Sequence, residues 1–198
     1  GETIIRNAAK EPEILDLQNY LQATGVQVSG AGTSIIKIKG SEHKLRSAEH
    51  TIITDRIVTG TYMAAAGIAG SELLLRNVIP EHLSSIISLL RESGCRISVK
   101  GSTMLITGPS RLRAIDIIRT LPYPGFPTDM QAQLVAMLTI ARGTSIMVET
   151  VFENRYKHVD ELLRMGANIK LEGRLAVIKG VKKLIGANVY ARDLRGGA

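Results

Sequence analysis

The chain has 198 residues, 44% of them hydrophobic and 22% charged, which is the composition of a globular protein and excludes a disordered one. The longest apolar run, Tyr62 to Ala69, is far shorter than the roughly 20 residues of a membrane-spanning helix. The first residues lack the layout of a secretory signal, so we expect a cytoplasmic protein with no membrane contact. With one cysteine, Cys95, and no Cys/His cluster of metal-ligand spacing, we expect no internal disulfide, no metal and no cofactor.

The formal net charge of +7 favours anionic partners such as nucleic acid, phosphorylated metabolites or the acidic part of a larger protein. Aromatic residues make up only 4% of the chain, which supplies little surface for base stacking. An RNA-binding module would also need cations gathered on one exposed sheet face. Lys37, Lys39 and Lys179 lie on predicted strands, but so few cations are typical of solvated edges, and we expect no nucleic-acid partner.

Taken in order, the predicted elements repeat three times, over residues 1–40, 70–108 and 143–180. Each copy opens with an apolar, β-rich run. Helical spacing follows and ends just before a glycine, the usual left-handed stop of a helix. Two short strands joined by a glycine turn complete the copy. The opening runs are 3–7, 73–77 and 145–149, the glycines are Gly25, Gly94 and Gly166, and the strand pairs are 26–29 with 35–38, 95–98 with 104–106, and 167–170 with 175–178.

A further helix precedes the second and third copies, from Asp55 to Ala69 and from Asp129 to Arg142, and Asp193 begins another. Aspartate is an ordinary N-cap at such starts. The repeat is therefore α-β-α-β-β, and it predicts an α/β (α+β) fold with helices inside and sheets outside, because each helix has one apolar stripe to bury. Cys95 falls on the inner face of a strand and is expected in the core. Since the chain starts and stops inside repeats, we expect it to be part of a longer protein.

Positions that differ among the copies indicate function, because packing explains the positions that they share. Arg155 and His158 occupy places on the third copy's helix that are apolar in the other two. A cation there needs a partner. For Arg155 this partner is either Glu153 or Asp160, or else an anionic substrate, whereas for His158 a structural role is favoured.

The linker before the third copy, residues 121–133, has three prolines and a glycine within seven residues. Such a stiff approach delivers Asp129 and the free N–H groups of a helix start to a defined point. A capped helix after a rigid loop explains the pattern as well as a reactive carboxylate does. A capping aspartate is also a weak base, since the N–H groups stabilise its charged form.

Several long strings resemble the signature segments of UDP-N-acetylglucosamine 1-carboxyvinyltransferases, and the resemblance covers essentially the whole chain. The strings are PGFPTDMQAQ at 124–133, ETVFENRYKHVDEL at 149–162 with RMG at 164–166, and DLR at 193–195; residues 7–14, 55–57 and 60–61 fit as well.

The resemblance implies transfer of the enolpyruvyl group of phosphoenolpyruvate to the 3-hydroxyl of UDP-N-acetylglucosamine, releasing phosphate. This is the first committed step of peptidoglycan synthesis, with consequences for the cell wall, cell shape, the cell cycle and cell division. The resemblance also implies an enzyme of two domains, each an inside-out α/β barrel of three repeats, with the active site between them. Residues 1–50 would be the last repeat of the substrate-side domain, and residues 51–198 would be two repeats and the start of a third of the second domain.

By the same resemblance, Asp129 would contact the sugar hydroxyl and take its proton, or only orient the sugar. Val151 would offer a backbone contact to the UDP-sugar, with Phe152 beside it. Around the reacting centre and its anionic groups the resemblance places Arg155, Asp193 and Arg195. Guanidinium groups suit phosphoenolpyruvate, which carries a carboxylate and a phosphate.

In this family the proton donor is a cysteine on a mobile loop that would lie upstream of Gly1, and Cys95 does not occupy that place. We therefore expect the isolated chain to be inactive and to need the remainder of the same enzyme as its partner. The nearest rival is the related enolpyruvyl transferase of the shikimate pathway, against which the string FPTDMQ at 126–131 argues. A stand-alone scaffold derived from such an enzyme is a further alternative.

Overall fold

The computed structural model describes residues 1–40, 44–191 and 197. The chain divides into two compact units, one of residues 1–54 with 122–124, the other of residues 55–121 with 125–198. The boundary expected near residue 50 falls close to this division, and the assignment of the parts to two domains of a longer enzyme stays a prediction. Asp193 and Arg195 lie outside the described residues.

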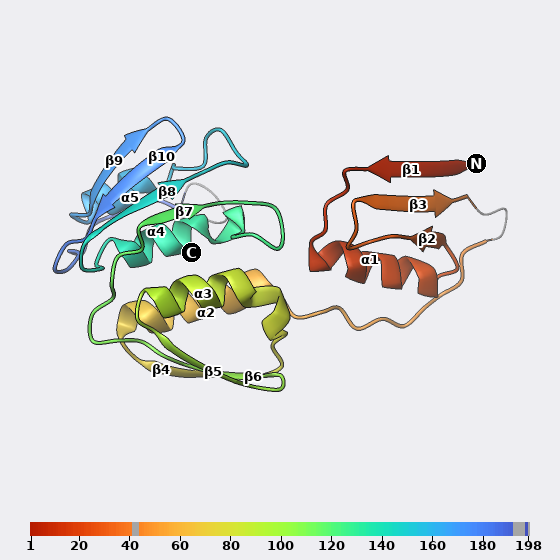
Figure 1. The fold of residues 1–198 in the computed structure, drawn as a ribbon, viewed down its shortest axis with the longest axis horizontal. Coiled ribbons are helices and arrows are strands. Elements are labelled where there is room, and N and C mark those ends of the chain that lie inside the picture. Colours follow the sequence, from red (N-terminus) through yellow and green to blue (C-terminus); the bar gives the residue numbers. More distant parts are fainter. Residues whose placement is uncertain (41–43, 192–196, 198) are drawn as a thin grey trace. The chain divides into compact units, whose positions relative to one another are not determined.

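The first unit contains the first copy of the repeat (Figure 1). Its elements are β1 (Glu2–Arg6), α1 (Pro12–Ala23), β2 (Gln27–Ser29) and β3 (Ile35–Lys39). Pro12 starts α1, where its missing N–H costs nothing. The strands form an antiparallel sheet in the order β1-β3-β2.

The second unit begins with α2, whose start is set by Asp55. The carboxylate of this residue accepts the N–H groups of Ile57 at 2.7 Å and Val58 at 3.0 Å, which confirms the predicted N-cap. The elements of this copy are α2 (Arg56–Ala69), β4 (Glu72–Leu75), the 3-10 turn η1 (Pro80–Leu83), α3 (Ser84–Glu92), β5 (Arg96–Lys100) and β6 (Thr103–Thr107). Its antiparallel sheet has the order β4-β6-β5.

The third copy adds one strand to the pattern. Its elements are β7 (Ile117–Arg119), the 3-10 turn η2 (Thr128–Met130), α4 (Gln131–Leu138), β8 (Thr144–Val148), α5 (Val159–Arg164), β9 (Asn168–Glu172) and β10 (Leu175–Lys179). The sheet order is β7-β8-β10-β9, and β7 pairs with β8 in parallel. Without β7, the order is the one found in the other two copies.

This shared strand order, together with the turns, confirms the predicted repeat. The glycines that follow α1, α3 and α5 are left-handed, with φ of 100° at Gly25, 105° at Gly94 and 85° at Gly166. A residue with a Cβ is strained in this conformation, so glycine is what lets the chain reverse into the next strand.

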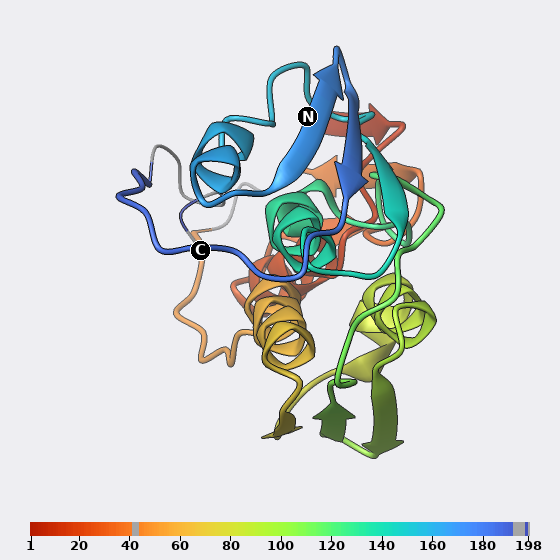
Figure 2. The same ribbon diagram turned by 90° about the vertical axis from the view of Figure 1, so that its left-hand side faces the viewer.

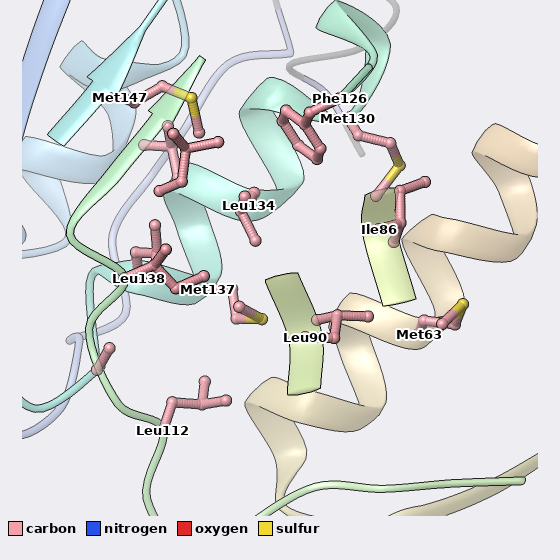
Figure 3. Packing of buried hydrophobic residues seen from close by; sticks show 14 of the residues in the cluster. Met63, Ile86, Leu90, Leu112, Phe126, Met130, Leu134, Met137, Leu138 and Met147 are labelled. Atoms are coloured by element: carbon pink, nitrogen blue, oxygen red, sulfur yellow. The ribbon is translucent and has the colours of Figure 1, made fainter. Parts of the chain in front are cut away.

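The core of the second unit lies between its two sheets. Helices α2 and α3 cover the β4-β6-β5 sheet, α4 covers β8 and β10, and α2 packs against α4. Figure 2 looks nearly along these helices, with a sheet on either side. Side chains from the helices interdigitate between the layers, among them Met63, Ile86, Leu90, Leu134 and Met137 (Figure 3). The prediction of helices inside and sheets outside is confirmed within this unit.

Three local predictions need correction. Strand β7 was not predicted, because three residues carry little pattern and their parallel partner is remote in the sequence. The helix expected from Asp129 to Arg142 spans only Gln131–Leu138. Asp129 lies in the preceding 3-10 turn and is not the N-cap of that helix; the N-cap is Met130, which makes no side-chain capping bond.

The third correction concerns the helix of the third copy. Helix α5 begins only at Val159, so Arg155 precedes it and His158 is its N-cap residue. Arg155 therefore is not on a face of this helix, whereas His158 lies at its start and is 8% exposed. Cys95, in contrast, is 4% exposed and sits in the core, as predicted. Among the described residues, no helix has the length and apolar character needed to cross a bilayer.

Candidate active site

The candidate site lies where the parallel strands β7 and β8 end. Their register pairs Arg119 with Val148, so Thr120 and Glu149 come next on neighbouring strands. The Thr120 N–H donates to the carbonyl of Val148 at 3.1 Å, and the Thr150 N–H donates to the Thr120 hydroxyl at 2.9 Å. Carboxyl ends of parallel strands are the usual place for binding sites in α/β proteins.

Glu149 is the buried centre of this region, with 1% of its surface exposed. Its Oε1 accepts the Thr120 hydroxyl at 2.9 Å and the N–H groups of Val151 at 2.9 Å and Phe152 at 3.1 Å. Its Oε2 accepts the Thr128 hydroxyl at 2.9 Å. The ion pairs found among the described residues do not include Glu149. Uncharged donors therefore hold this carboxylate.

Asp129 and Arg155 meet beside this centre. The Arg155 Nη2 lies 2.6 Å from Asp129 Oδ1, and the guanidinium carbon lies 4.8 Å from the centre of the Phe152 ring. The side chains of Arg155 and Asp129 are 21% and 35% exposed, so solutes can reach the pair. Of the two neighbouring carboxylates suggested from the sequence, Glu153 instead contacts Arg174 at 3.3 Å, and the partner of Arg155 is Asp129.

Val151 and Phe152 form the exposed edge of the same region, at 42% and 47% exposure. Both N–H groups are used by Glu149, so a ligand that touches the backbone of Val151 has to use its carbonyl. Thus the structure brings together four of the six residues singled out from the sequence. Asp193 and Arg195, the other two, lie outside the described part of the chain.

Tyr156 anchors the far end of the loop that carries Arg155. Its hydroxyl donates to the carbonyl of Met147 at 2.9 Å and approaches that of Arg174 at 3.3 Å. Burial raises the pKa of the Tyr156 hydroxyl, and the negative charge of Glu149 raises it further, so the group stays a donor. His158 is 8% exposed, with its ring centre 6.3 Å from that of Tyr156.

Glu149, Thr120 and Thr128 were not predicted from the sequence as parts of the site. One signal was available: on β8, Ser145 and Met147 point inward, and alternation carries the same face on to Glu149. A carboxylate at an inward position needs hydrogen-bond donors, and it therefore indicates that polar groups from other segments gather around it. The donors themselves could not be found this way, because Thr128 lies 21 residues away in the sequence.

A cavity of about 350 Å³ in the same unit is separate from this site, because neither Asp129 nor Arg155 lines it. It lies between α2, α4 and α5, and its walls include Ala64, Ala65 and Ala132. Among the described residues, no group of three or more His, Cys, Asp or Glu side chains is arranged to hold a metal ion.

Solved structures with this architecture are enolpyruvyl transferases. The enolpyruvyl transferase NikO from Streptomyces tendae matches 91% of the chain with a TM-score of 0.79 at 23% identity, over 43% of its own length. EPSP synthase from Acinetobacter baumannii matches 94% of the chain with a TM-score of 0.51 at 18% identity, also over 43% of its length. The chain therefore has part of the enolpyruvyl transferase fold.

The sequence profile of the EPSP synthase (3-phosphoshikimate 1-carboxyvinyltransferase) family matches residues 1–198, and the chain belongs to this family. Among its relatives, UDP-N-acetylglucosamine 1-carboxyvinyltransferase 1 of Carboxydothermus hydrogenoformans is 56% identical over 198 residues. UDP-N-acetylglucosamine 1-carboxyvinyltransferase 2 of Caldanaerobacter subterraneus subsp. tengcongensis is 55% identical over 197 residues. Both matches cover 100% of the chain and 47% of the relative, so the chain spans about half the length of these curated relatives.

Proposed function

We propose that this chain is part of an enzyme that transfers the enolpyruvyl group of phosphoenolpyruvate to the 3-hydroxyl of UDP-N-acetylglucosamine and releases phosphate. The observation that carries the proposal is the Asp129–Arg155 pair, 2.6 Å apart and accessible, beside the exposed residues Val151 and Phe152. Relatives at 52% to 56% identity are named for this sugar nucleotide and for carboxyvinyl transfer, which supports the choice of acceptor.

In this proposal Asp129 receives the proton of the sugar hydroxyl, or holds that hydroxyl in line, as its oxygen bonds to carbon 2 of phosphoenolpyruvate. The methylene carbon gains a proton in the same addition. Elimination then removes a proton from the resulting methyl group and expels phosphate, which restores the double bond. The donor of the proton to the methylene carbon would belong to the remainder of the enzyme.

Arg155 would have two tasks. By bonding Asp129 Oδ1 it fixes the direction in which the carboxylate points. Its guanidinium also brings positive charge to a site that must receive a carboxylate and a phosphate. Asp193 and Arg195 would complete the surroundings of the reacting centre. The Val151 carbonyl would accept a hydrogen bond from the sugar, since the N–H of that residue already donates to Glu149.

The complete enzyme would act in the cytoplasm in the first committed step of peptidoglycan synthesis, and through the cell wall it would affect cell shape, the cell cycle and cell division. The remainder of the same enzyme is the partner that the chain requires, and neither nucleic acid nor membrane is needed. Residues 1–50 would be the last repeat of the substrate-side domain, and residues 51–198 would belong to the second domain. On this proposal the 198-residue chain alone is inactive.

The decisive experiment is calorimetric titration of the complete enzyme with UDP-N-acetylglucosamine, combined with measurement of phosphate release. Asp129→Ala should lower turnover about 100-fold or more, the usual contribution of a positioned acid or base, and should weaken binding of the sugar nucleotide. Arg155→Ala should weaken both. Asp160→Ala is the matched control, because this aspartate is an exposed residue on α5 outside the pair, and it should behave as wild type.

Wild-type turnover by Asp129→Ala would refute the proposed role. Turnover with shikimate 3-phosphate in place of the UDP-sugar would refute the proposed acceptor. Phosphate release by the isolated chain, supplied with both substrates, would refute its predicted inactivity.

A further inference from the structure

Glu149 stands where the third copy of the repeat departs from the other two. In every copy, one N–H after the opening strand donates to the carbonyl of the residue that precedes the last strand. The pairs are Ala8 to Ser34 at 3.1 Å, Val78 to Ser102 at 3.0 Å, and Glu149 to Arg174 at 2.8 Å. By this bond Glu149 is the structural equivalent of Ala8 and Val78, although the sequence alignment placed it opposite Asn7 and Asn77.

The two asparagines explain the difference. Asn7 and Asn77 follow their strands in a left-handed conformation, with φ of 54° and 57°. Each adds one residue before the hydrogen bond that the three copies share. Glu149 is not left-handed and follows β8 directly. Its side chain consequently takes an inward position that Val78, 5% exposed, fills in the second copy.

Burying a carboxylate at this inward position costs more free energy than burying a valine side chain, because the carboxylate loses its hydration and needs hydrogen-bond donors from the protein. The four donors of Glu149 come from three separate segments: Thr120 at the end of β7, Thr128 in the 3-10 turn η2, and Val151 with Phe152 in the loop after β8. Thr128 is the immediate neighbour of Asp129. The buried carboxylate of Glu149 therefore links the turn that carries Thr128 and Asp129 to the loop that carries Val151 and Phe152.

We propose that Glu149 is a positioning residue of the active site, which sets the distance between the Asp129 carboxylate and the carbonyl of Val151. This inference rests on the proposed function, because these are the two groups proposed to meet the sugar. Glu149 itself touches no substrate and acts through Thr128 and the N–H groups of residues 151 and 152.

Two substitutions separate geometry from charge. Glu149→Gln can keep three of the four bonds through Oε1 and can turn its amide toward Thr128, whose hydroxyl is able to accept instead of donate. Glu149→Ala removes all four. Ser145→Ala is the matched control, since Ser145 is 1% exposed on the same strand and accepts the Ile115 N–H at 3.0 Å, away from the site.

In the complete enzyme, Glu149→Ala should lower kcat/KM for UDP-N-acetylglucosamine about 100-fold, the usual scale for a misplacement of about 1 Å. Glu149→Gln should stay within about threefold of wild type, and Ser145→Ala should lose thermal stability with kcat/KM unchanged. Since Glu149 positions Asp129 through its bond to Thr128, the double variant with Asp129→Ala should lose less than the product of the two single losses.

The proposal is overturned if Glu149→Ala is no more harmful than Ser145→Ala, if Glu149→Gln is as harmful as Glu149→Ala, or if the two single losses multiply. Should Glu149→Ala fail to fold, Thr128→Val provides the test, with an expected loss of about tenfold because one bond of four disappears.

A second measurement needs no substrate. Hydrogen exchange of the Val151 and Phe152 amides should speed up at least about tenfold in Glu149→Ala and remain at the wild-type rate in Ser145→Ala, because only the first variant frees these N–H groups. Faster exchange in an enzyme that does not bind the sugar nucleotide would sink the proposed function and keep the positioning role of Glu149. Unchanged exchange would sink the positioning role alone.

Discussion

Replacing Arg155 by methionine should cost little stability and much activity. Methionine keeps the apolar stem beside Phe152 and removes the charge that lies 2.6 Å from Asp129. Two unit charges about 4 Å apart attract by about 4 kcal/mol at an effective dielectric constant near 20. Most of this is offset, because the side chains are 21% and 35% exposed and must be held in one geometry; such pairs contribute about 0.2–1 kcal/mol net.

The position of the guanidinium over the Phe152 ring adds about 0.5–1 kcal/mol. Arg155→Met should thus lower the free energy of unfolding by about 1–2 kcal/mol. A double-mutant cycle with Asp129→Asn should assign about 0.5–1 kcal/mol of that to the pair, an amount that shrinks as salt is raised. In the complete enzyme, the same substitution should lower kcat/KM about 100-fold or more, because an oriented carboxylate and an anion-binding group are lost together.

The stability arm is a urea unfolding series on the single and double variants, and the activity arm is phosphate release. A stability loss above about 3 kcal/mol would mean that the pair is chiefly structural. Activity within about threefold of wild type would mean that Arg155 serves neither Asp129 nor an anionic substrate. Either result refutes the reasoning.

A Cβ at residue 180 would collide with the backbone carbonyl of Ala141, so Gly180→Ala should lower the free energy of unfolding by about 3 kcal/mol, whereas Gly186→Ala, in open space, should change it by less than about 0.5 kcal/mol. The Tyr156 hydroxyl has its pKa raised above the ordinary 10.0 by burial, so only the unfolded chain deprotonates just above pH 10. Stability should therefore fall as the pH rises past 10, by up to about 1.4 kcal/mol per pH unit from this residue, and Tyr156→Phe should remove that part of the slope in a pH series of urea melts. Cys95 is buried, and burial raises the pKa of its thiol, so its labelling by a thiol reagent should be slow and should accelerate only as urea unfolds the chain; rapid labelling of the native protein would contradict this.

The helix of the third copy starts later than predicted because the loop before it is held by other hydrogen bonds. Helical spacing continued upstream of α5 as far as Arg155, but the loop that carries Arg155 is held instead by hydrogen bonds to Glu149 and to the end of β8. The N–H groups of Val151 and Phe152 bond to Glu149, and the Tyr156 hydroxyl bonds to the carbonyl of Met147. Helix α5 begins only beyond these bonds, at Val159.

Local chemistry, which is written directly in the sequence, determined the repeat. Apolar periodicity and the glycines after the helices act over a few residues, so the three strands shared by the copies, the turns at Gly25, Gly94 and Gly166, and the inward-facing helices could be predicted.

The contacts within the site were decided by the tertiary structure alone. Arg155 lies 26 residues from Asp129, and Thr120 and Thr128 lie 29 and 21 residues from Glu149. No local pattern selects such pairs. They form because parallel pairing of β7 with β8 and packing of α4 on the sheet bring the three segments to one place, where a buried carboxylate and an accessible one each take the donors within reach.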